Sequence, residues 1–108
     1  MKLLTKVEEF ILLAIWSLRE QAYSLAIQRH ISEISNENWS LGTIYAPLER
    51  LEKRGHIYSY ITEPKPEKGG RQKRVYCITD GGKKALLQSR EVQKSMWEKV
   101  SVVHQNSE

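Results

Sequence analysis

The segment from Phe10 to Leu18 contains one polar residue, Ser17. Thr5 and Glu8 precede it in the T-x-x-E spacing of a capping box, which satisfies backbone N–H groups at a helix start. The pattern predicts a helix that runs to about Arg19. A helix that is apolar on nearly every side must be covered on more than one face. A chain of 108 residues suits one small domain, so a second subunit is expected to supply part of that cover.

Two shorter helical segments follow the first. Ser24 can cap a helix over residues 25–34, whose isoleucines lie on one face. A polar connection over residues 35–38 leads to Ser40, which can cap a third helix. Two short helices joined by a polar turn predict a helix-turn-helix.

The third helix, over residues 41–54, contains two residues that disfavour helix interiors. Gly42 costs roughly 1 kcal/mol and Pro47 roughly 3 kcal/mol relative to alanine. Gly42 falls in the first turn, where Ser40 can cap the helix and where the missing side chain lets another surface approach. Pro47 has no N–H for the Thr43 carbonyl, which predicts a bend or an irregular turn. Arg54-Gly55 is typical of a helix C-terminus.

After Gly55 the pattern changes to β structure. Residues 56–62 and 75–79 are β-branched and aromatic, and the loop between them contains two prolines and a glycine pair, so we expect a hairpin with a long tip. Thr79 and Asp80 can cap a last helix from Asp80 to His104. Its apolar stripe comprises Ala85, Val92, Met96, Val100 and Val103, with Leu86 and Trp97 beside it. The predicted fold class is α+β and mostly helical, with a winged helix-turn-helix domain at 1–79 and a C-terminal dimerisation helix and tail at 80–108.

Composition argues against several classes of function. The three histidines are scattered, and there is no glycine-rich phosphate loop between a strand and a helix, so neither an enzyme nor a metal or cofactor site is expected. Cys77 is the only cysteine, which fits a reducing, cytoplasmic setting. The sequence has no run long enough to span a bilayer, so no membrane partner is expected. The net charge of +4 matters only if the charge gathers on one face.

The tip of the hairpin gathers positive charge. KGGRQKR, residues 68–74, has four cationic side chains and no acid. Such groups neutralise DNA phosphates and release counterions. A lone basic loop is more often a solvated turn, but beside a helix-turn-helix DNA binding is favoured. Ser40, Thr43 and Tyr45 add hydroxyl groups near a helix N-terminus, which itself favours phosphate, although each alone can be structural.

The motifs GTIYAPLERLEKRGHI and GGRQKRVYCITDGGKKAL resemble the PadR-like transcriptional regulators. The resemblance implies a homodimeric repressor that binds a palindromic operator in double-stranded DNA, near its own gene or a transporter or stress gene. It implies that the first and last helices form the dimer and that the third helix enters the major groove. The residues expected to contact DNA are Ser24, Ser40, Leu41, Gly42, Thr43, Tyr45, Arg50, Lys68, Gly69, Gly70, Arg71, Lys73, Arg74 and Tyr76.

Some members of the family release DNA when they bind small aromatic compounds. Here the candidate ligand-binding residues are Trp16, Met96, Trp97 and Val100, since an aromatic face can hold a flat or cationic molecule. Simple packing in a dimer is the competing interpretation. Two further alternatives stay open at this point: a winged-helix module that binds protein, and a sensor whose main activity is binding aromatic compounds.

Overall fold

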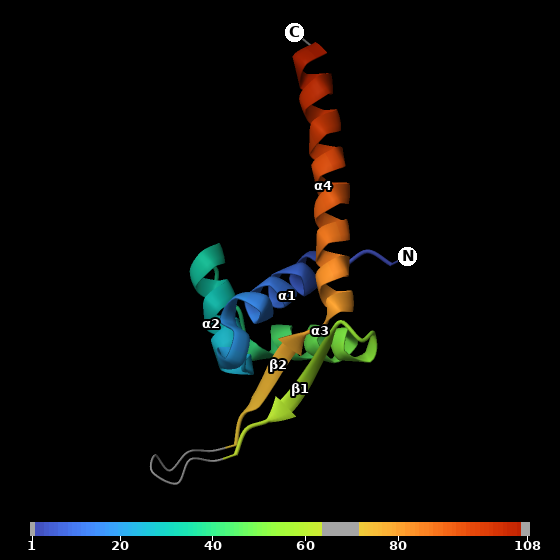
Figure 1. The fold of residues 1–108 in the computed structure, drawn as a ribbon. Helices are drawn as coiled ribbons and strands as arrows, with labels where there is room; N and C mark the ends of the chain where they lie inside the picture. Colours follow the sequence, from blue (N-terminus) through green and yellow to red (C-terminus); the bar gives the residue numbers. More distant parts are fainter. Residues whose placement is uncertain (1, 64–71, 107–108) are drawn as a thin grey trace.

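The computed structural model describes residues 2–63 and 72–106 of the chain (Figure 1). The elements are α1 (Lys6–Leu18), a short 3-10 turn η1 (Arg19–Gln21), α2 (Ser24–Ser35), α3 (Leu41–Lys53), β1 (Ile57–Ile61), β2 (Arg74–Ile78) and α4 (Asp80–Asn106). Three helices, a two-stranded antiparallel wing and a long C-terminal helix make a winged helix-turn-helix, as the sequence predicted.

The starts of α1 and α3 follow the predicted caps, and the start of α2 does not. The Thr5 capping box is present, with the Glu8 N–H donating to Thr5 Oγ1 at 3.1 Å and the Thr5 N–H donating to Glu8 Oε1 at 2.8 Å. Ser40 caps α3 by accepting from the Thr43 N–H at 3.2 Å. The predicted cap at Ser24 is wrong by one residue. Tyr23 is extended there and its carbonyl accepts from Ile27, so Ser24 is already the first residue of α2.

The end of α3 is a Schellman motif. Gly55 has a positive φ of 76°, its N–H donates to the Glu52 carbonyl at 3.0 Å, and the His56 N–H donates to the Leu51 carbonyl at 2.9 Å. Between its ends α3 is α-helical throughout, with Pro47 buried inside it, so the expected irregular turn is wrong. A bend of the helix axis stays a prediction.

The core surrounds α1. Ile11, Leu12 and Ile15 are almost wholly buried, and α1 contacts α2, α3, β2 and α4. The other core residues are mainly branched aliphatic side chains from α2, α3, β1 and α4: Ile27, Ile31, Ile44, Leu48, Leu51, Ile57 and Leu86. The first helix is therefore covered on more than one face within a single chain, and yet Leu13 and Trp16 remain 51% and 37% exposed.

The wing is tied to the helical part through its inner strand. β1 pairs with β2 in the register Ile57↔Ile78 to Ile61↔Arg74. On the other edge of β2 the Tyr76 N–H donates to the Ala22 carbonyl at 2.8 Å, just after η1. This hydrogen bond fixes the base of the wing relative to α1 and α2.

α4 begins against the domain and then leaves it. Thr79 Oγ1 accepts from the Gly82 N–H at 3.0 Å and donates to the Gly55 carbonyl at 2.7 Å, which confirms the predicted cap. Leu86 and Ser89 are buried, and beyond Gln93 the helix projects away from the other elements (Figure 1). The start of α4 coincides with the proposed boundary between residues 79 and 80; the division into two domains stays a prediction.

Candidate nucleic-acid interface

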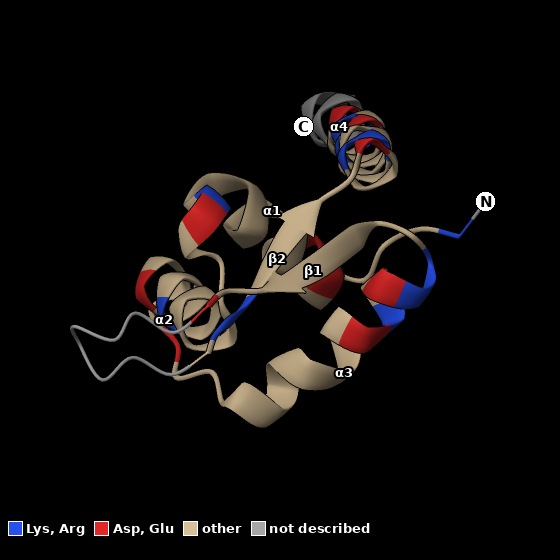
Figure 2. Ribbon diagram, turned by 60° about the horizontal axis from the view of Figure 1, so that its bottom comes forward, with Lys and Arg blue, Asp and Glu red and all other residues tan. Residues whose placement is uncertain are grey.

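The N-terminal half of α3 presents an exposed, uncharged face to solvent. Gly42, Thr43 and Tyr45 are exposed, whereas Ile44 and Leu48 on the opposite face are buried. The charged residues of α3 all lie in its C-terminal half (Figure 2). An uncharged helix end with small and hydroxyl-bearing side chains can enter a groove without electrostatic repulsion.

Two hydroxyl groups are joined at the start of α3. Ser40 Oγ and Thr43 Oγ1 lie 2.9 Å apart and are exposed, so each keeps capacity for a further hydrogen bond. Leu41 is half-buried beside them, and Ser24 is half-buried at the first turn of α2. The backbone N–H groups at both helix starts are suited to phosphate oxygens.

Gly42 is not required by the packing of the chain itself. A Cβ at this position would meet only Ser40 Oγ, at 3.8 Å, which is an ordinary van der Waals contact. The helix keeps a glycine where alanine would be more stable by about 1 kcal/mol.

Sequence reasoning missed two residues on the exposed face of α3. Ala46 and Glu49 are exposed and follow Gly42 at helical spacing, i+4 and i+7. Glu49 forms a surface ion pair with Lys53 at 3.3 Å. The i, i+4, i+7 spacing from Gly42 is the sequence signal that places both on this face.

The wing carries positive charge at its base. Arg74 donates to Ser59 Oγ at 2.8 Å, and Lys73 Nζ lies 4.3 Å from the centre of the Tyr23 ring. Both residues are exposed, so these contacts hold the side chains in place and leave their charges accessible. The remaining predicted wing residues lie outside the described part of the chain: Lys68, Gly69, Gly70 and Arg71.

One predicted DNA contact, Tyr76, does not fit the structure, and a second, Arg50, is engaged within the chain. Tyr76 is only 8% exposed and packs in the core, since its strand turns that side chain toward the helices. Arg50 Nε donates to Glu8 Oε2 at 3.2 Å, and Arg54 Nη1 donates to the same oxygen at 3.2 Å. Arg50 therefore pairs with a buried carboxylate, while its own side chain stays 45% exposed. Tyr76 does not belong to the exposed surface, and a DNA contact by Arg50 stays a prediction.

Glu8 is ionised in this setting. Burial raises the pKa of its carboxyl, but the hydrogen bond from the Thr5 N–H and the nearby charges of Arg50 and Arg54 outweigh burial. The pKa consequently lies below its ordinary value of 4.5. The carboxylate and the two guanidinium groups form a charged cluster between α1 and α3.

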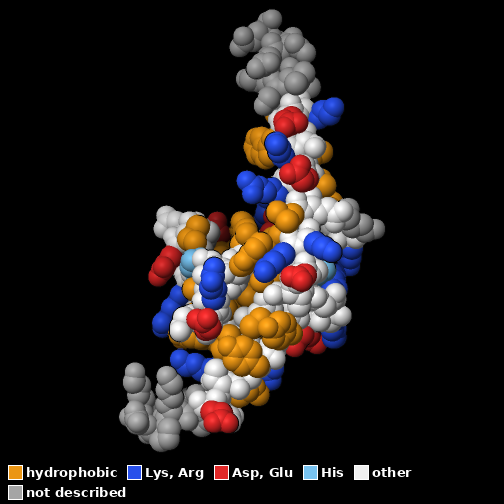
Figure 3. Space-filling view, in the orientation of Figure 1, with side chains coloured by type: hydrophobic (Ala, Val, Ile, Leu, Met, Phe, Trp, Pro, Cys, Tyr) orange, Lys and Arg blue, Asp and Glu red, His pale blue; other side chains and the backbone are white. Residues whose placement is uncertain are grey.

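The predicted ligand-binding residues lie on exposed apolar surface. Met96, Trp97 and Val100 are 64%, 68% and 58% exposed on the projecting part of α4. Apolar side chains also gather over α1, between α2 and α4 (Figure 3). Trp16 lines a cavity of about 280 Å³ between α1 and α4. Gln93 is the residue farthest along α4 that lines this cavity. The structure thus does not bring Trp16 together with the other three within one chain.

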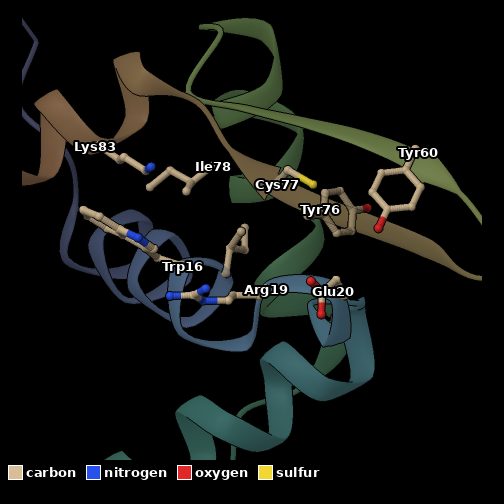
Figure 4. Close-up of a pocket in the computed structure, with 9 residues that line it drawn as sticks. Trp16, Arg19, Glu20, Tyr60, Tyr76, Cys77, Ile78 and Lys83 are labelled. Carbon is tan, nitrogen blue, oxygen red and sulfur yellow. The ribbon is translucent and has the colours of Figure 1, made fainter.

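Trp16 also lines a second cavity, of about 360 Å³, between the end of α1, η1 and the wing (Figure 4). Lys83 Nζ lies 5.1 Å from the centre of the Trp16 ring, and Tyr60 and Cys77 close the opposite side.

Among the described residues there is no group of three or more metal-ligating side chains. Within the same residues, no helix is both long enough and apolar enough to cross a bilayer.

The model of the transcriptional regulator PadR-like family matches residues 12–88, which span the helix-turn-helix, the wing and the base of α4. The chain belongs to the PadR-like family. The resemblance predicted from the two motifs is confirmed. As a PadR-like protein it is a DNA-binding transcriptional regulator and not an enzyme.

Solved structures of transcriptional regulators share the PadR-like fold. One from Clostridium thermocellum is 27% identical, with 94% of this chain and 88% of that chain covered and a TM-score of 0.65. A PadR family transcription regulator from Clostridium difficile is 24% identical, with 94% of this chain and 97% of that chain covered and a TM-score of 0.65. A Streptococcus transcriptional regulator is 21% identical over 91% of both chains, with a TM-score of 0.73. No curated protein matches the sequence.

Proposed function

We propose that this PadR-like regulator is a cytoplasmic homodimeric repressor that binds a palindromic operator near its own gene or a transporter or stress gene. The observation that carries the proposal is the exposed reading end of α3, which we define as Ser40, Gly42, Thr43 and Tyr45. Its Gly42 is unexplained by internal packing. Family membership favours this function over a protein-binding module.

The proposed contacts divide into base reading and backbone positioning. The reading end of α3 enters the major groove, where the Thr43 and Tyr45 side chains reach base edges. Lys73 and Arg74 at the base of the wing contact phosphates, together with the residues of the wing tip. Leu41 and Ser24 border the reading end and contact the DNA backbone.

Exposed apolar surface supports the homodimer. Phe10, Leu13 and Ile34 are 38%, 51% and 74% exposed and line an apolar groove of about 580 Å³ between α1 and α2. The projecting part of α4 carries the second exposed apolar stripe, with Met96 and Val100. A single chain leaves both surfaces in water, and association of two chains through α1 and α4 covers them.

We also propose that the regulator binds a small aromatic effector. Trp97 is 68% exposed, and in the dimer the partner's α4 or α1 would face it. Two indole rings, Trp16 and Trp97, can then stack on a flat molecule at the interface, with Met96 and Val100 beside it. Ligand binding there changes the separation of the two reading ends and releases DNA.

DNA binding is tested with the double-stranded DNA upstream of its own gene, by fluorescence anisotropy at several salt concentrations. Replacement of Arg71, Lys73 and Arg74 by glutamine should weaken binding. It should also reduce the slope of log Kd against log salt concentration, because up to about three fewer phosphates are neutralised per subunit. Replacement of Lys94, Lys99 and Arg90 on α4 by glutamine removes the same charge far from the wing and is the matched control. Equal effects in both variants would contradict the wing assignment.

A further inference from the structure

Glu8 is the only charged side chain that is fully buried among the residues that the structure describes. Both of its carboxylate oxygens are used. Oε1 accepts from the Thr5 N–H at 2.8 Å, and Oε2 accepts from Arg50 Nε and Arg54 Nη1, each at 3.2 Å. One carboxylate therefore joins the first turn of α1 to the last two turns of α3.

A buried ion pair of this kind contributes little net stability. Taking a carboxylate out of water is costly, and apolar residues of similar volume often serve as well or better. What charged hydrogen bonds add is direction, since the hydrophobic effect itself is non-directional. The packing of Ile44, Leu48 and Leu51 buries one side of α3, and Glu8 supplies the directional contact.

The anchored end of α3 lies far from its reading end. A rise of 1.5 Å per residue places Leu41 about 14 Å along the axis from Arg50. A tilt of about 10° at the anchored end would therefore move the reading end by roughly 2 Å, which is enough to break a hydrogen bond to a base. Phosphate contacts through long cationic side chains tolerate such a shift better.

We infer that Glu8 is a positioning residue that sets the orientation of α3 for sequence-specific DNA binding, through Arg50 and Arg54. The inference rests on the proposed function. α1 also carries the apolar surface assigned to the dimer, so the same carboxylate links the dimer contact to the reading end. The residues that contact DNA are then different from the residue that orients them.

The test compares Glu8→Gln with Glu9→Gln in the full-length protein. Both variants lose one carboxylate from α1, but the ion pair of Glu9 is with Lys6 of the same helix, at 3.6 Å, and not with α3. Each variant gains positive charge, which by itself tightens non-specific DNA binding. Affinity is measured for the upstream DNA of its own gene and for a scrambled DNA of equal length, at temperatures where circular dichroism shows the variants folded.

The positioning role predicts that Glu8→Gln loses about ten-fold or more in affinity for the upstream DNA, as for the loss of one or two base contacts. Its affinity for scrambled DNA should be unchanged or higher, and Glu9→Gln should bind both DNAs as tightly as the unmodified protein or more tightly. If Glu8→Gln is folded and keeps its preference for the upstream DNA, the inference is overturned. If the unmodified protein shows no preference, the proposed function fails first, and the inference with it.

A second variant covers the case in which Glu8→Gln does not fold. Arg54→Lys keeps every charge but loses the guanidinium hydrogen bond to Glu8 Oε2, while the contact from Arg50 remains. We expect a loss of about three-fold or more in affinity for the upstream DNA, none for scrambled DNA, and faster hydrogen exchange in α3 than in α1. Unchanged preference and unchanged exchange in Arg54→Lys would overturn the inference, leaving Glu8 with a role in folding alone.

Discussion

Gly82 packs directly against the main chain of His56. A Cβ at position 82 would overlap the His56 carbonyl oxygen and lie 2.8 Å from Ile78 Cγ1. The first turn of α4 can therefore rest on the segment that connects α3 to β1 only because residue 82 has no side chain.

Gly82→Ala should consequently destabilise the protein by about 1 to 3 kcal/mol, since neither the backbone of His56 nor the core can move aside cheaply. Gly81→Ala is the matched control, because its Cβ would have no neighbour closer than 3.6 Å. Gly81→Ala should be neutral or stabilising by up to about 1 kcal/mol. Urea denaturation of both variants measures the difference, and equal stabilities would refute the close contact.

Gly42→Ala should separate stability from DNA binding. Alanine fits within the chain and raises helix propensity, so the free energy of unfolding should rise by up to about 1 kcal/mol. If DNA approaches Gly42 closely, affinity for the upstream DNA should fall about ten-fold or more, because the new methyl group prevents close approach. Gly81→Ala, the same change far from the reading end, should leave affinity as it is. A stabilised Gly42→Ala that binds normally would remove Gly42 from the interface.

The stability of the fold should depend on the ionisation of Glu8. Its pKa is lower in the folded protein than the ordinary value of 4.5, because the Thr5 N–H, Arg50 and Arg54 favour the charged form. The contribution of Glu8 is therefore complete above about pH 4.5 and is lost as the pH falls through the lower, folded pKa. Urea denaturation from about pH 6 to pH 3 should show Glu8→Gln approaching the unmodified protein in stability at the acid end. A constant difference across that range would show that Glu8 does not titrate in this way; Glu9→Gln serves as the comparison.

Dimer formation should depend on the apolar stripe of α4. Met96→Glu places a charge on that stripe, where burial of methionine stabilises by roughly 1.5 to 3 kcal/mol. We expect the dimer dissociation constant to rise at least about ten-fold, measured by analytical ultracentrifugation. Lys94→Glu introduces the same residue on the other side of the helix and should leave the dimer intact. A monomeric unmodified protein, or an intact Met96→Glu dimer, would contradict the proposed interface.

Planar aromatic dyes should quench tryptophan fluorescence if Trp97 stacks on effectors. Trp97→Ala should lose most of the quenching and Trp16→Ala part of it. Trp39 is an internal reference in both variants, since it is half-buried with its ring centre 6.1 Å from that of Phe10. Quenching that survives Trp97→Ala would leave Trp97 with a packing role only.

Features that depend on neighbouring residues could be predicted from the sequence. The Thr5 capping box, the helix end at Gly55 and the β-branched segments of the wing each depend on residues a few positions apart. Ser24 shows the limit of such reasoning, because Tyr23 and not Ser24 is the N-cap of α2.

The contacts that sequence reasoning missed join distant parts of the chain. Arg50 lies 42 residues from Glu8, and an arginine on a helix looks the same in a sequence whether it faces DNA or a buried carboxylate. Tyr76 was expected to contact DNA from the family resemblance, which does not say which face of its strand is covered. Gly82 carries no local signal in the sequence that reveals the backbone of His56 beside it.

The hydrogen bond from the Tyr76 N–H to the Ala22 carbonyl means that the wing is not an autonomous hairpin. Its inner strand is completed by a segment that precedes α2, so two parts of the chain far apart in sequence must meet before the wing is stable. An isolated two-stranded hairpin is marginal in water. A peptide of residues 56–79 should therefore be unstructured, and the wing cannot be transplanted onto another protein as a module.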